Sequence, residues 1–189
     1  LSTGMHSIEE IDRAIEILKN DDAEYVLMQC TSIYPLKERD VNLWILKMYS
    51  ERYNCEVGYS GHDTGVIAPA ISAVLGALVI EKHVTLDRAM KGPDHAASLE
   101  NRGLDLTIKY IKSGLEMLGS KDKKILNEEF RSREKYCFSV RAQHDIKEGE
   151  DFTEENITLK SPKVENGRDY YELLGQKAEK NYKKDDLIL

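Results

Sequence analysis

The stretch CEVGYSGHDTGVIAPAISAVLGALVIEKH, residues 55–83, has the pattern of one strand, one helix and a second strand. Short apolar runs open it at 55–60 and close it at 77–83, and the apolar segment 66–75 lies between them. Such runs predict buried strands, and a helix between two of them indicates a parallel βαβ unit.

The same alternation continues outward from this unit. One more strand and three more helices are predicted at residues 24–31, 7–19, 40–52 and 104–118. The first of these helices opens with Ser7 and Glu10, which have the spacing of a capping box. Strict alternation predicts an α/β fold with a parallel sheet. Three strands and the stub at 1–5 cannot close an eight-stranded barrel, which needs about 250 residues, and would be half of one.

The composition changes after Gly119. Residues 120–135 are highly charged and are expected to form a linker between two domains, at 1–119 and 136–189. The last domain carries short runs separated by turn clusters, with strands expected at 136–142, 151–159 and 175–182. This pattern predicts a small, mostly β module.

Charge and hydropathy exclude several classes of function. The chain has 27 Lys and Arg against 34 Asp and Glu, a net charge of −7, which argues against nucleic-acid binding because that needs a basic face. With 32% charged and 41% hydrophobic residues, the balance is that of a soluble globular protein. The apolar stretch 66–80 is shorter than the roughly 18 residues of a membrane-spanning helix. We expect it to lie in the core, and we expect no membrane association.

Cysteine usage bears on the compartment. Cys30, Cys55 and Cys137 are widely spaced and form no CxxC pair, so neither a disulfide framework nor a zinc site is indicated. No targeting signal is recognised at the N-terminus. A cytoplasmic location is therefore expected.

Polar side chains gather where two of the predicted strands end. Ser60 and His62 are two residues apart in one strand, and the next strand ends with Glu81 and His83 at the same spacing. Alternation points each pair to one side, and the carboxyl ends of parallel strands meet at one edge of the sheet. Two neutral imidazoles there can share a divalent metal ion, with a carboxylate beside them. Two such histidines can equally be structural, and their spacing leaves both interpretations open.

Nearby loops carry further candidates. Asp94 lies in the loop KGPDHAASLE. It can be a functional loop residue, or it can simply shape a turn. Ser32 and Tyr34 follow the preceding strand with hydroxyls suited to a phosphate or a sugar, although such hydroxyls also cap helices or pack. Ser2, in the N-terminal STG, is placed like a phosphate contact at a strand end.

In this order and spacing, the strings resemble the sialic acid synthase family, enzymes that condense phosphoenolpyruvate with an N-acetylmannosamine-type sugar. Five motifs carry the resemblance, namely STGM, QCTSIYPL with DVNL, GYSGHDTG, GALVIEKHVTLD and GPDHAASLE. In the tail, FSVRAQHDIKEGEDFTEENITLK and LLGQKAEKNYKKDD resemble the small antifreeze-like, or SAF, domain that ends those synthases. The match spans nearly the whole chain.

The resemblance implies a fold and an assembly. The chain would be the second half of a (β/α)₈ TIM barrel followed by a SAF domain. The full protein would be a homodimer in which the SAF domain of one subunit covers the barrel mouth of the other. His62 and His83 match the ligands of a divalent metal ion, Mn²⁺ or Mg²⁺.

The resemblance also implies the substrate contacts. Ser2 and Ser60 match residues that contact phosphoenolpyruvate, whereas Tyr34, Glu81 and Asp94 match residues that hold the amino sugar near its reacting carbonyl. In the implied reaction the sugar aldehyde is polarised by the metal and attacked by C3 of phosphoenolpyruvate, and water adds at C2 before phosphate leaves. Glu81 is the expected carrier of a proton.

Two positions depart from the family pattern. Ser32 stands where bacterial members that take the free sugar commonly have Asn, which alters one phosphoenolpyruvate contact. Ser161 stands where the SAF domain usually sends an Arg into the partner's sugar site, although Arg168 lies close by. These features favour the animal-type enzymes, which act on N-acetylmannosamine 6-phosphate. The string DHAAS speaks against pseudaminic acid synthesis, and legionaminic acid synthesis remains an alternative.

The family's phosphate-binding lysines and an N-terminal glutamate belong to the first half of the barrel and have no counterpart in this chain. We therefore expect a fragment of a larger protein, with an open sheet edge, poor stability and no activity alone. An alternative of another class is a catalytically dead module that binds a sugar or a partner. If Mn²⁺ does not protect the protein from unfolding, the assignment of His62 and His83 as metal ligands fails.

Overall fold

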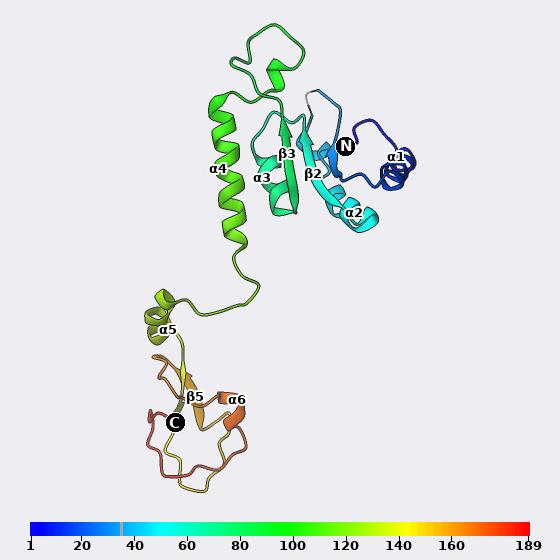
Figure 1. Ribbon diagram of the computed structural model, residues 1–189. Helices are drawn as coiled ribbons and strands as arrows, with labels where there is room; N and C mark the ends of the chain where they lie inside the picture. Colours follow the sequence, from blue (N-terminus) through cyan, green and yellow to red (C-terminus); the bar gives the residue numbers. More distant parts are fainter. Residues whose placement is uncertain (35) are drawn as a thin grey trace. The chain divides into compact units, whose positions relative to one another are not determined.

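The computed structural model describes residues 1–34 and 36–189, and Pro35 of the QCTSIYPL motif lies outside the described residues. The chain divides into two compact units, Leu1–Ser120 and Lys121–Leu189. The colours of the ribbon in Figure 1 follow the residue numbers, so each unit can be found there. Each unit has an apolar core of its own.

A parallel sheet forms the centre of the first unit. Its strands are β1 at Val26–Cys30, β2 at Glu56–Gly61 and β3 at Ala77–Lys82, in the order β1-β2-β3. An isolated parallel bridge between Ser2 and Met28 places the N-terminal segment beside β1. The predicted α/β fold with a parallel sheet is confirmed, and the strand bounds differ from the predicted ones by at most two residues.

Among the described residues of this unit, four α-helices accompany the sheet, α1 at Ile8–Asn20, α2 at Trp44–Tyr53, α3 at Ile67–Val74 and α4 at Asn101–Leu118. α1 begins at the predicted capping box: the Ser7 hydroxyl accepts from the backbone N–H of Glu10, and the Glu10 carboxylate accepts from the N–H of Ser7. The apolar sides of α1 and α2 pack on one face of the sheet, where Leu27 and Val57 are buried. α4 packs against α3 and runs beside it in Figure 1.

The second helix is shorter than predicted. The sequence pattern predicts it at 40–52, whereas α2 begins at Trp44 and follows a 3-10 turn at Glu38–Asp40. Asn42, between the two, adopts a left-handed φ of 53°. A continuous right-handed helix cannot contain that conformation, so the helix starts after it.

β3 and the apolar stretch before it are less buried than predicted. Leu78 and Val79 of β3 are exposed, because β3 pairs only with β2 among the described residues. Ile67 and Ile71 of α3 are exposed as well. The expectation that 66–80 lies in the core is therefore wrong for much of its length. In the described part of the chain, no helix is long and apolar enough to cross a membrane.

The second unit is built around an antiparallel pair, β4 at Ser139–Ala142 and β5 at Ile157–Lys160. Short helices lie at Phe130–Tyr136 (α5) and Tyr170–Leu173 (α6). The core of the unit consists of Val140, Ala142, Ile146, Phe152, Ile157, Leu173, Ala178, Tyr182 and Ile188. A small antiparallel sheet and irregular connections agree with the pattern predicted for the tail.

The strands predicted in this unit are only partly right. The first begins at Ser139 rather than at 136, because Tyr136 is the last residue of α5 and the strand starts only after Cys137 and Phe138. The strand predicted at 175–182 does not form, and this segment makes only isolated bridges, to Asp151 and Ile146. Gly175 instead lies in a turn with a left-handed φ of 79°, and residues 179–180 form a bend, so the segment makes no continuous pairing.

Residues 120–135, predicted to be a linker, are partly helical. They contain a 3-10 turn at Asn127–Glu129 and most of α5. The carboxylate of Glu129 accepts a hydrogen bond of 2.8 Å from the N–H of Leu126 at the start of that turn. This capping contact gives a charged segment a local fold that its composition does not predict.

Candidate active site

The carboxyl ends of β2 and β3 bring two pairs of predicted site residues to one edge of the sheet. The register sets Ser60 beside Glu81, and the Ser60 hydroxyl donates a hydrogen bond of 2.6 Å to the Glu81 carboxylate. His62 and His83 each follow two residues later, on the same side of the sheet. In Figure 1 the arrowheads of β2 and β3 point to this edge, and the loop between β3 and α4 starts from it.

His62 and His83 lie side by side, with ring centroids 5.3 Å apart. His62 is only 9% exposed, and its Nδ1 lies 2.9 Å from the carbonyl oxygen of Thr31. Because a carbonyl oxygen can only accept, Nδ1 carries a hydrogen, and the lone pair of the neutral ring is on Nε2. A histidine fixed in this way has the tautomer and the ring orientation of a metal ligand.

Tyr34 and Asp94 join this group from two loops. The Tyr34 ring lies 4.3 Å from the His62 ring and 6.2 Å from the His83 ring. One carboxylate oxygen of Asp94 lies 3.9 Å from Nδ1 of His83, which is ion-pair range rather than a hydrogen bond. Desolvation of the ring, followed by the charge of Asp94, raises the pKa of Tyr34. The phenol therefore stays protonated at neutral pH and can donate a hydrogen bond.

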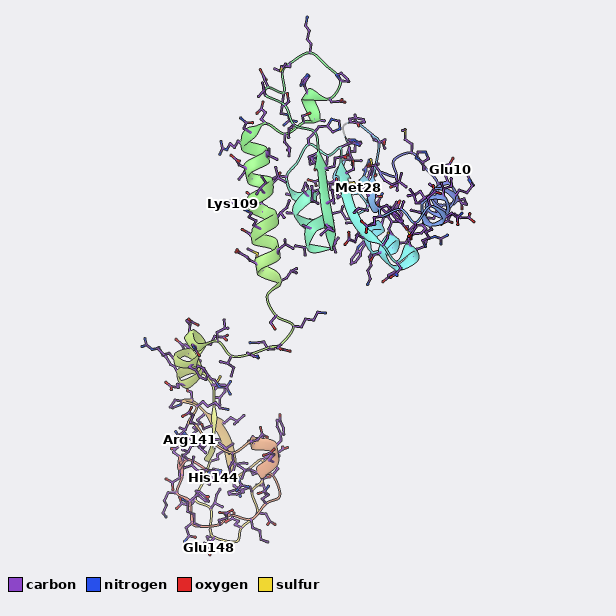
Figure 2. All side chains as sticks on the ribbon, viewed as in Figure 1. Glu10, Met28, Lys109, Arg141, His144 and Glu148 are labelled. Atoms are coloured by element: carbon purple, nitrogen blue, oxygen red, sulfur yellow. The ribbon has the colours of Figure 1, made fainter. Side chains whose placement is uncertain are left out.

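The two remaining predicted contacts lie farther along the sheet. Ser2 stands beside β1, with its hydroxyl 4.0 Å from the sulfur of Met28, which is labelled in Figure 2. Ser32 faces Gly4, because a β-carbon on Gly4 would come within 2.1 Å of the Ser32 hydroxyl oxygen. Ser32 also lines a cavity of about 290 Å³ beside the N-terminal segment. The structure thus groups Ser32 with the N-terminal segment rather than with the histidine pair.

A divalent cation would find part of its ligand set here. His62 and His83 present ring nitrogens just beyond the ends of neighbouring strands, and Glu81 lies in β3, two residues before His83. Among the described residues, no three His, Cys, Asp or Glu side chains are grouped closely enough to hold a metal ion. The fit is therefore partial: two histidine rings could each supply one nitrogen, and water or substrate oxygens would have to supply the other ligands.

Ser161, which stands where the resemblance predicts an arginine, lies in the second unit. Ser161 precedes a cis peptide bond to Pro162. Arg168, the nearby arginine, bonds to the side chain of Gln176, and its guanidinium lies 3.8 Å from the carboxylate of Glu179. In this structure Arg168 is therefore paired within its own unit.

Sequence reasoning missed a set of residues next to the histidines. Cys30 lies with its sulfur 3.9 Å from Nδ1 of His62. On the other side of the sheet, Nζ of Lys82 lies 2.9 Å from Oδ1 of Asp63, and these side chains are 5% and 7% exposed. The Tyr59 hydroxyl donates to the same carboxylate oxygen at 2.6 Å. Lysine and aspartate are rarely buried, so residue type alone does not predict that Asp63 and Lys82 are buried. The only feature of the sequence that could have singled them out is their position directly beside His62 and His83.

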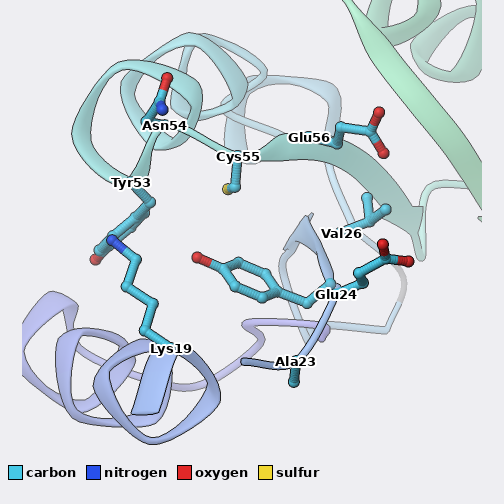
Figure 3. Close-up of a pocket in the computed structure, with 9 residues that line it drawn as sticks. Lys19, Ala23, Glu24, Val26, Tyr53, Asn54, Cys55 and Glu56 are labelled. Atoms are coloured by element: carbon cyan, nitrogen blue, oxygen red, sulfur yellow. The ribbon is translucent and has the colours of Figure 1, made fainter. Parts of the chain in front are cut away.

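A separate cavity of about 670 Å³ lies at the opposite, amino ends of β1 and β2. Figure 3 shows Lys19, Glu24, Tyr53 and Cys55 among the residues that line it. Burial raises the pKa of the Cys55 thiol, which lowers its reactivity. Ligands of parallel α/β sheets bind beyond the carboxyl ends of the strands, so this cavity is not the candidate site.

Comparison with known proteins places the chain among its relatives. A model described as the NeuB family matches residues 1–123. The chain belongs to the NeuB family. The resemblance to sialic acid synthases that the motifs predict is confirmed at the level of the family.

Two curated relatives of this NeuB family chain are similar over its whole length. The N,N'-diacetyllegionaminic acid synthase of Campylobacter jejuni is 40% identical over 100% of the chain and 58% of its own length. The N-acetylneuraminate-9-phosphate synthase of Homo sapiens is 36% identical over 100% of the chain and 54% of its own length. The chain thus spans about half the length of the curated relatives it matches.

A solved structure supports the same relationship. The N-acetylneuraminic acid (sialic acid) synthetase of Leptospira borgpetersenii, crystallised with citrate, is 32% identical with a TM-score of 0.63. The likeness covers 70% of this chain and 46% of that one.

Proposed function

We propose that this chain is part of a sialic acid synthase. The whole enzyme joins C3 of phosphoenolpyruvate to the aldehyde carbon of open-chain N-acetylmannosamine or its 6-phosphate. Water adds at C2 of the phosphoenolpyruvate unit, and the bond from that carbon to the phosphate oxygen breaks. The products are N-acetylneuraminate, or its 9-phosphate, and inorganic phosphate.

One observation carries this proposal. The rings of Tyr34, His62 and His83 meet at the carboxyl ends of β2 and β3, beside the hydrogen-bonded pair of Ser60 and Glu81. Enzymes with parallel βα units assemble their sites at this edge of the sheet. Membership of the NeuB family and the names of the relatives support the same assignment.

The first set of proposed roles concerns the sugar. His62 and His83 would hold a divalent cation, Mn²⁺ or Mg²⁺, which when bound supplies Lewis-acid polarisation of a carbonyl oxygen. Tyr34 offers a protonated hydroxyl, and Asp94 offers a carboxylate, for the hydroxyls of the amino sugar. Both side chains would orient the sugar so that its aldehyde carbon faces phosphoenolpyruvate.

The second set concerns the proton and the other substrate. Glu81 would exchange a proton with the sugar oxygen or the attacking water, and the bond from Ser60 fixes its carboxylate for that task. Ser2 and Ser32 would offer hydroxyl hydrogens to phosphoenolpyruvate. Ser60 donates its hydrogen to Glu81, so it would contact phosphoenolpyruvate only in exchange for that bond. A hydroxyl binds a phosphate or carboxylate oxygen by donating to it.

The finer architecture belongs to the same proposal. We assign the first unit to the second half of a (β/α)₈ barrel and the second unit to a SAF domain. We also propose a cytoplasmic homodimer, in which the SAF domain of one subunit closes the barrel mouth of the other. The parallel sheet, the small antiparallel unit and the family membership support this assignment.

The test is release of phosphate from phosphoenolpyruvate by the protein purified from its native source. We expect release in the presence of Mn²⁺ and either N-acetylmannosamine or its 6-phosphate, with a product of the mass of a nine-carbon keto sugar acid. Release that needs no amino sugar, or no release with any acceptor, would contradict the proposal. The latter result together with tight sugar binding would favour a catalytically dead binding module.

A second candidate of the same class is legionaminic acid synthesis. The 40% identity to the N,N'-diacetyllegionaminic acid synthase of Campylobacter jejuni favours it. The two candidates differ in the amino sugar that is accepted, because the second would take the sugar precursor of legionaminic acid. The same phosphate assay with that sugar separates them, since the preferred acceptor gives the higher kcat/KM.

A further inference from the structure

The side of the sheet that faces the helices carries a buried ion pair. Lys82 of β3 and Asp63, two residues beyond β2, have side chains 5% and 7% exposed, with Nζ 2.9 Å from Oδ1. The same Oδ1 accepts from the buried Tyr59 hydroxyl at 2.6 Å, and Oδ2 accepts from the N–H of Gly65 at 3.2 Å. Lys82 also donates to the backbone carbonyl of Asp63.

These contacts join three strand ends. Lys82 belongs to β3 and Asp63 follows β2, so their bond ties one strand end to the next. Asp63 also forms an isolated parallel bridge with Leu36, which follows β1. Leu36 lies two residues after Tyr34, whose ring contacts His62. The cluster is therefore connected to each loop that supplies a ring to the candidate site.

Each member of the ion pair is the sequence neighbour of one of the two histidines. His62 directly precedes Asp63, and His83 directly follows Lys82. Neighbouring residues of a strand point to opposite faces, so the ion pair and the two histidines lie back to back across the sheet. Moving either charged residue along its strand would move the adjacent histidine with it.

We propose that the Asp63–Lys82 ion pair, with the hydroxyl of Tyr59, is a positioning device that sets the distance between His62 and His83. The proposal deepens the proposed function, because it takes the histidine pair as the metal-holding part of that site. A buried pair with no such task could be replaced by apolar side chains at little or no cost. Its place behind both proposed ligands resembles the supporting contacts that orient metal ligands in proteins.

Mn²⁺ binding to the 189-residue chain tests the proposal, with free Mn²⁺ measured by its electron paramagnetic resonance signal. We expect Lys82→Met to weaken Mn²⁺ binding at least about tenfold, as removal of outer-shell contacts does. Lys82→Arg keeps the charge but not the shape of the side chain, so it is expected to weaken binding less than Lys82→Met does. Lys47→Met, which removes an exposed lysine of α2, is the matched control and leaves binding unchanged.

A second measurement separates this proposal from the proposed function. Nuclear Overhauser contacts between the rings of His62 and His83, whose centroids lie 5.3 Å apart, should appear in the native chain and weaken or vanish in Lys82→Met. If the native chain binds no Mn²⁺, the metal assignment of the proposed function fails, and the ring contacts alone decide the positioning role. The proposal would be overturned if Lys82→Met folds and keeps the native ring contacts. If the native chain binds Mn²⁺, the variant would also have to keep the native Mn²⁺ affinity.

Tyr59→Phe covers the case in which Lys82→Met does not fold. This variant removes one hydroxyl that donates to Asp63 and leaves the ion pair in place. We expect a smaller change in the same direction, about threefold in Mn²⁺ affinity or a measurable loss of ring contacts. Unchanged affinity and unchanged ring contacts in Tyr59→Phe would then overturn the proposal.

Discussion

The bond from Nδ1 of His62 to the carbonyl of Thr31 leaves Nε2 as the ring atom that can bind a cation or a substrate oxygen. His83 is less constrained, because its Nδ1 is 3.9 Å from the nearest carboxylate oxygen of Asp94. The two rings therefore differ in how firmly they are held. His62 is the anchored member of the pair, and His83 can adjust to a bound group.

Substitution of either ring should remove the metal site. We expect His62→Ala and His83→Ala to weaken Mn²⁺ binding by at least about 100-fold, because each removes a proposed ligand outright and even outer-shell losses cost 10- to 100-fold. Titration calorimetry with Mn²⁺ measures the change. His144→Ala, an exposed histidine of the second unit, is the control and should bind like the native chain. Equal binding by all three variants would place the metal elsewhere.

The buried ion pair should also matter for stability. Lys82→Met leaves the Asp63 carboxylate buried without its partner, and we expect a loss of about 3 kcal/mol in the free energy of unfolding. Lys47→Met, at an exposed site, should change it by no more than about 0.5 kcal/mol. Urea unfolding at neutral pH measures both values. A loss below about 1 kcal/mol for Lys82→Met would mean that the carboxylate finds another partner or water.

At the scale of single elements, α1 shows how closely local sequence determines structure. Ser7 and Glu10 predict its first turn, and both capping bonds form. The apolar face of α1 packs on β1 and α2 through Ile11 and Ile15. Arg52 and Tyr53, at the end of α2, bond to the carboxylate of its Asp12.

The cap of α1 gives a prediction with a defined size. Ser7→Ala removes the acceptor for the N–H of Glu10 and should lower the free energy of unfolding by about 1 kcal/mol. Ser50→Ala, at an exposed position inside α2, is the control, and it should be neutral or slightly stabilising because alanine is the better helix former. Equal effects of the two substitutions would mean that the cap contributes nothing.

Asp12 gives a prediction with a pH dependence. Hydrogen bonds from Arg52, then from Tyr53, lower the pKa of its carboxyl group. A lowered pKa in the folded state stabilises the fold above the unfolded value of about 3.9, and this contribution is lost as the pH falls through the folded value. The urea midpoint of Asp12→Asn should therefore lie below that of the native chain at pH 6 and approach it at pH 3. A constant difference at both pH values would contradict this assignment.

Prediction from the sequence succeeded where a local pattern sufficed. The three strands of the first unit follow from short apolar runs, and the cap of α1 follows from the spacing of Ser7 and Glu10. The start of α2 was missed because the left-handed turn at Asn42 is set by the surrounding chain as well as by residue type. The pairing of Asp63 with Lys82 was missed because only the register of β2 and β3 brings the two side chains together.

At the scale of the whole molecule, two units with separate cores are joined by exposed chain. Residues from Gly119 to Ile125 lie outside α4 and the following 3-10 turn, and all are exposed. Among the described residues of the first unit, β3 pairs only with β2 and so forms one edge of the parallel sheet. The second unit packs around its own cluster, which includes Phe152 and Ile188.

This organisation predicts where the chain is cut. Trypsin should cleave first after Lys121, Lys123 or Lys124, because exposed chain between compact units is the preferred site of nicking. Mass spectrometry of the early fragments should show two resistant pieces with ends in this segment. First cleavage within β1, β2 or β3 would contradict the division into two units.

The central claim is that the histidine pair belongs to an enzyme that condenses phosphoenolpyruvate with an amino sugar. The most direct measurement is release of phosphate from phosphoenolpyruvate by the protein purified from its native source, with Mn²⁺, in the presence and absence of N-acetylmannosamine and its 6-phosphate. Phosphate release is expected only when an amino sugar is present, in equal amount to a nine-carbon sugar acid. Absence of release with every acceptor, legionaminic-type sugars included, from protein shown to be folded would contradict it.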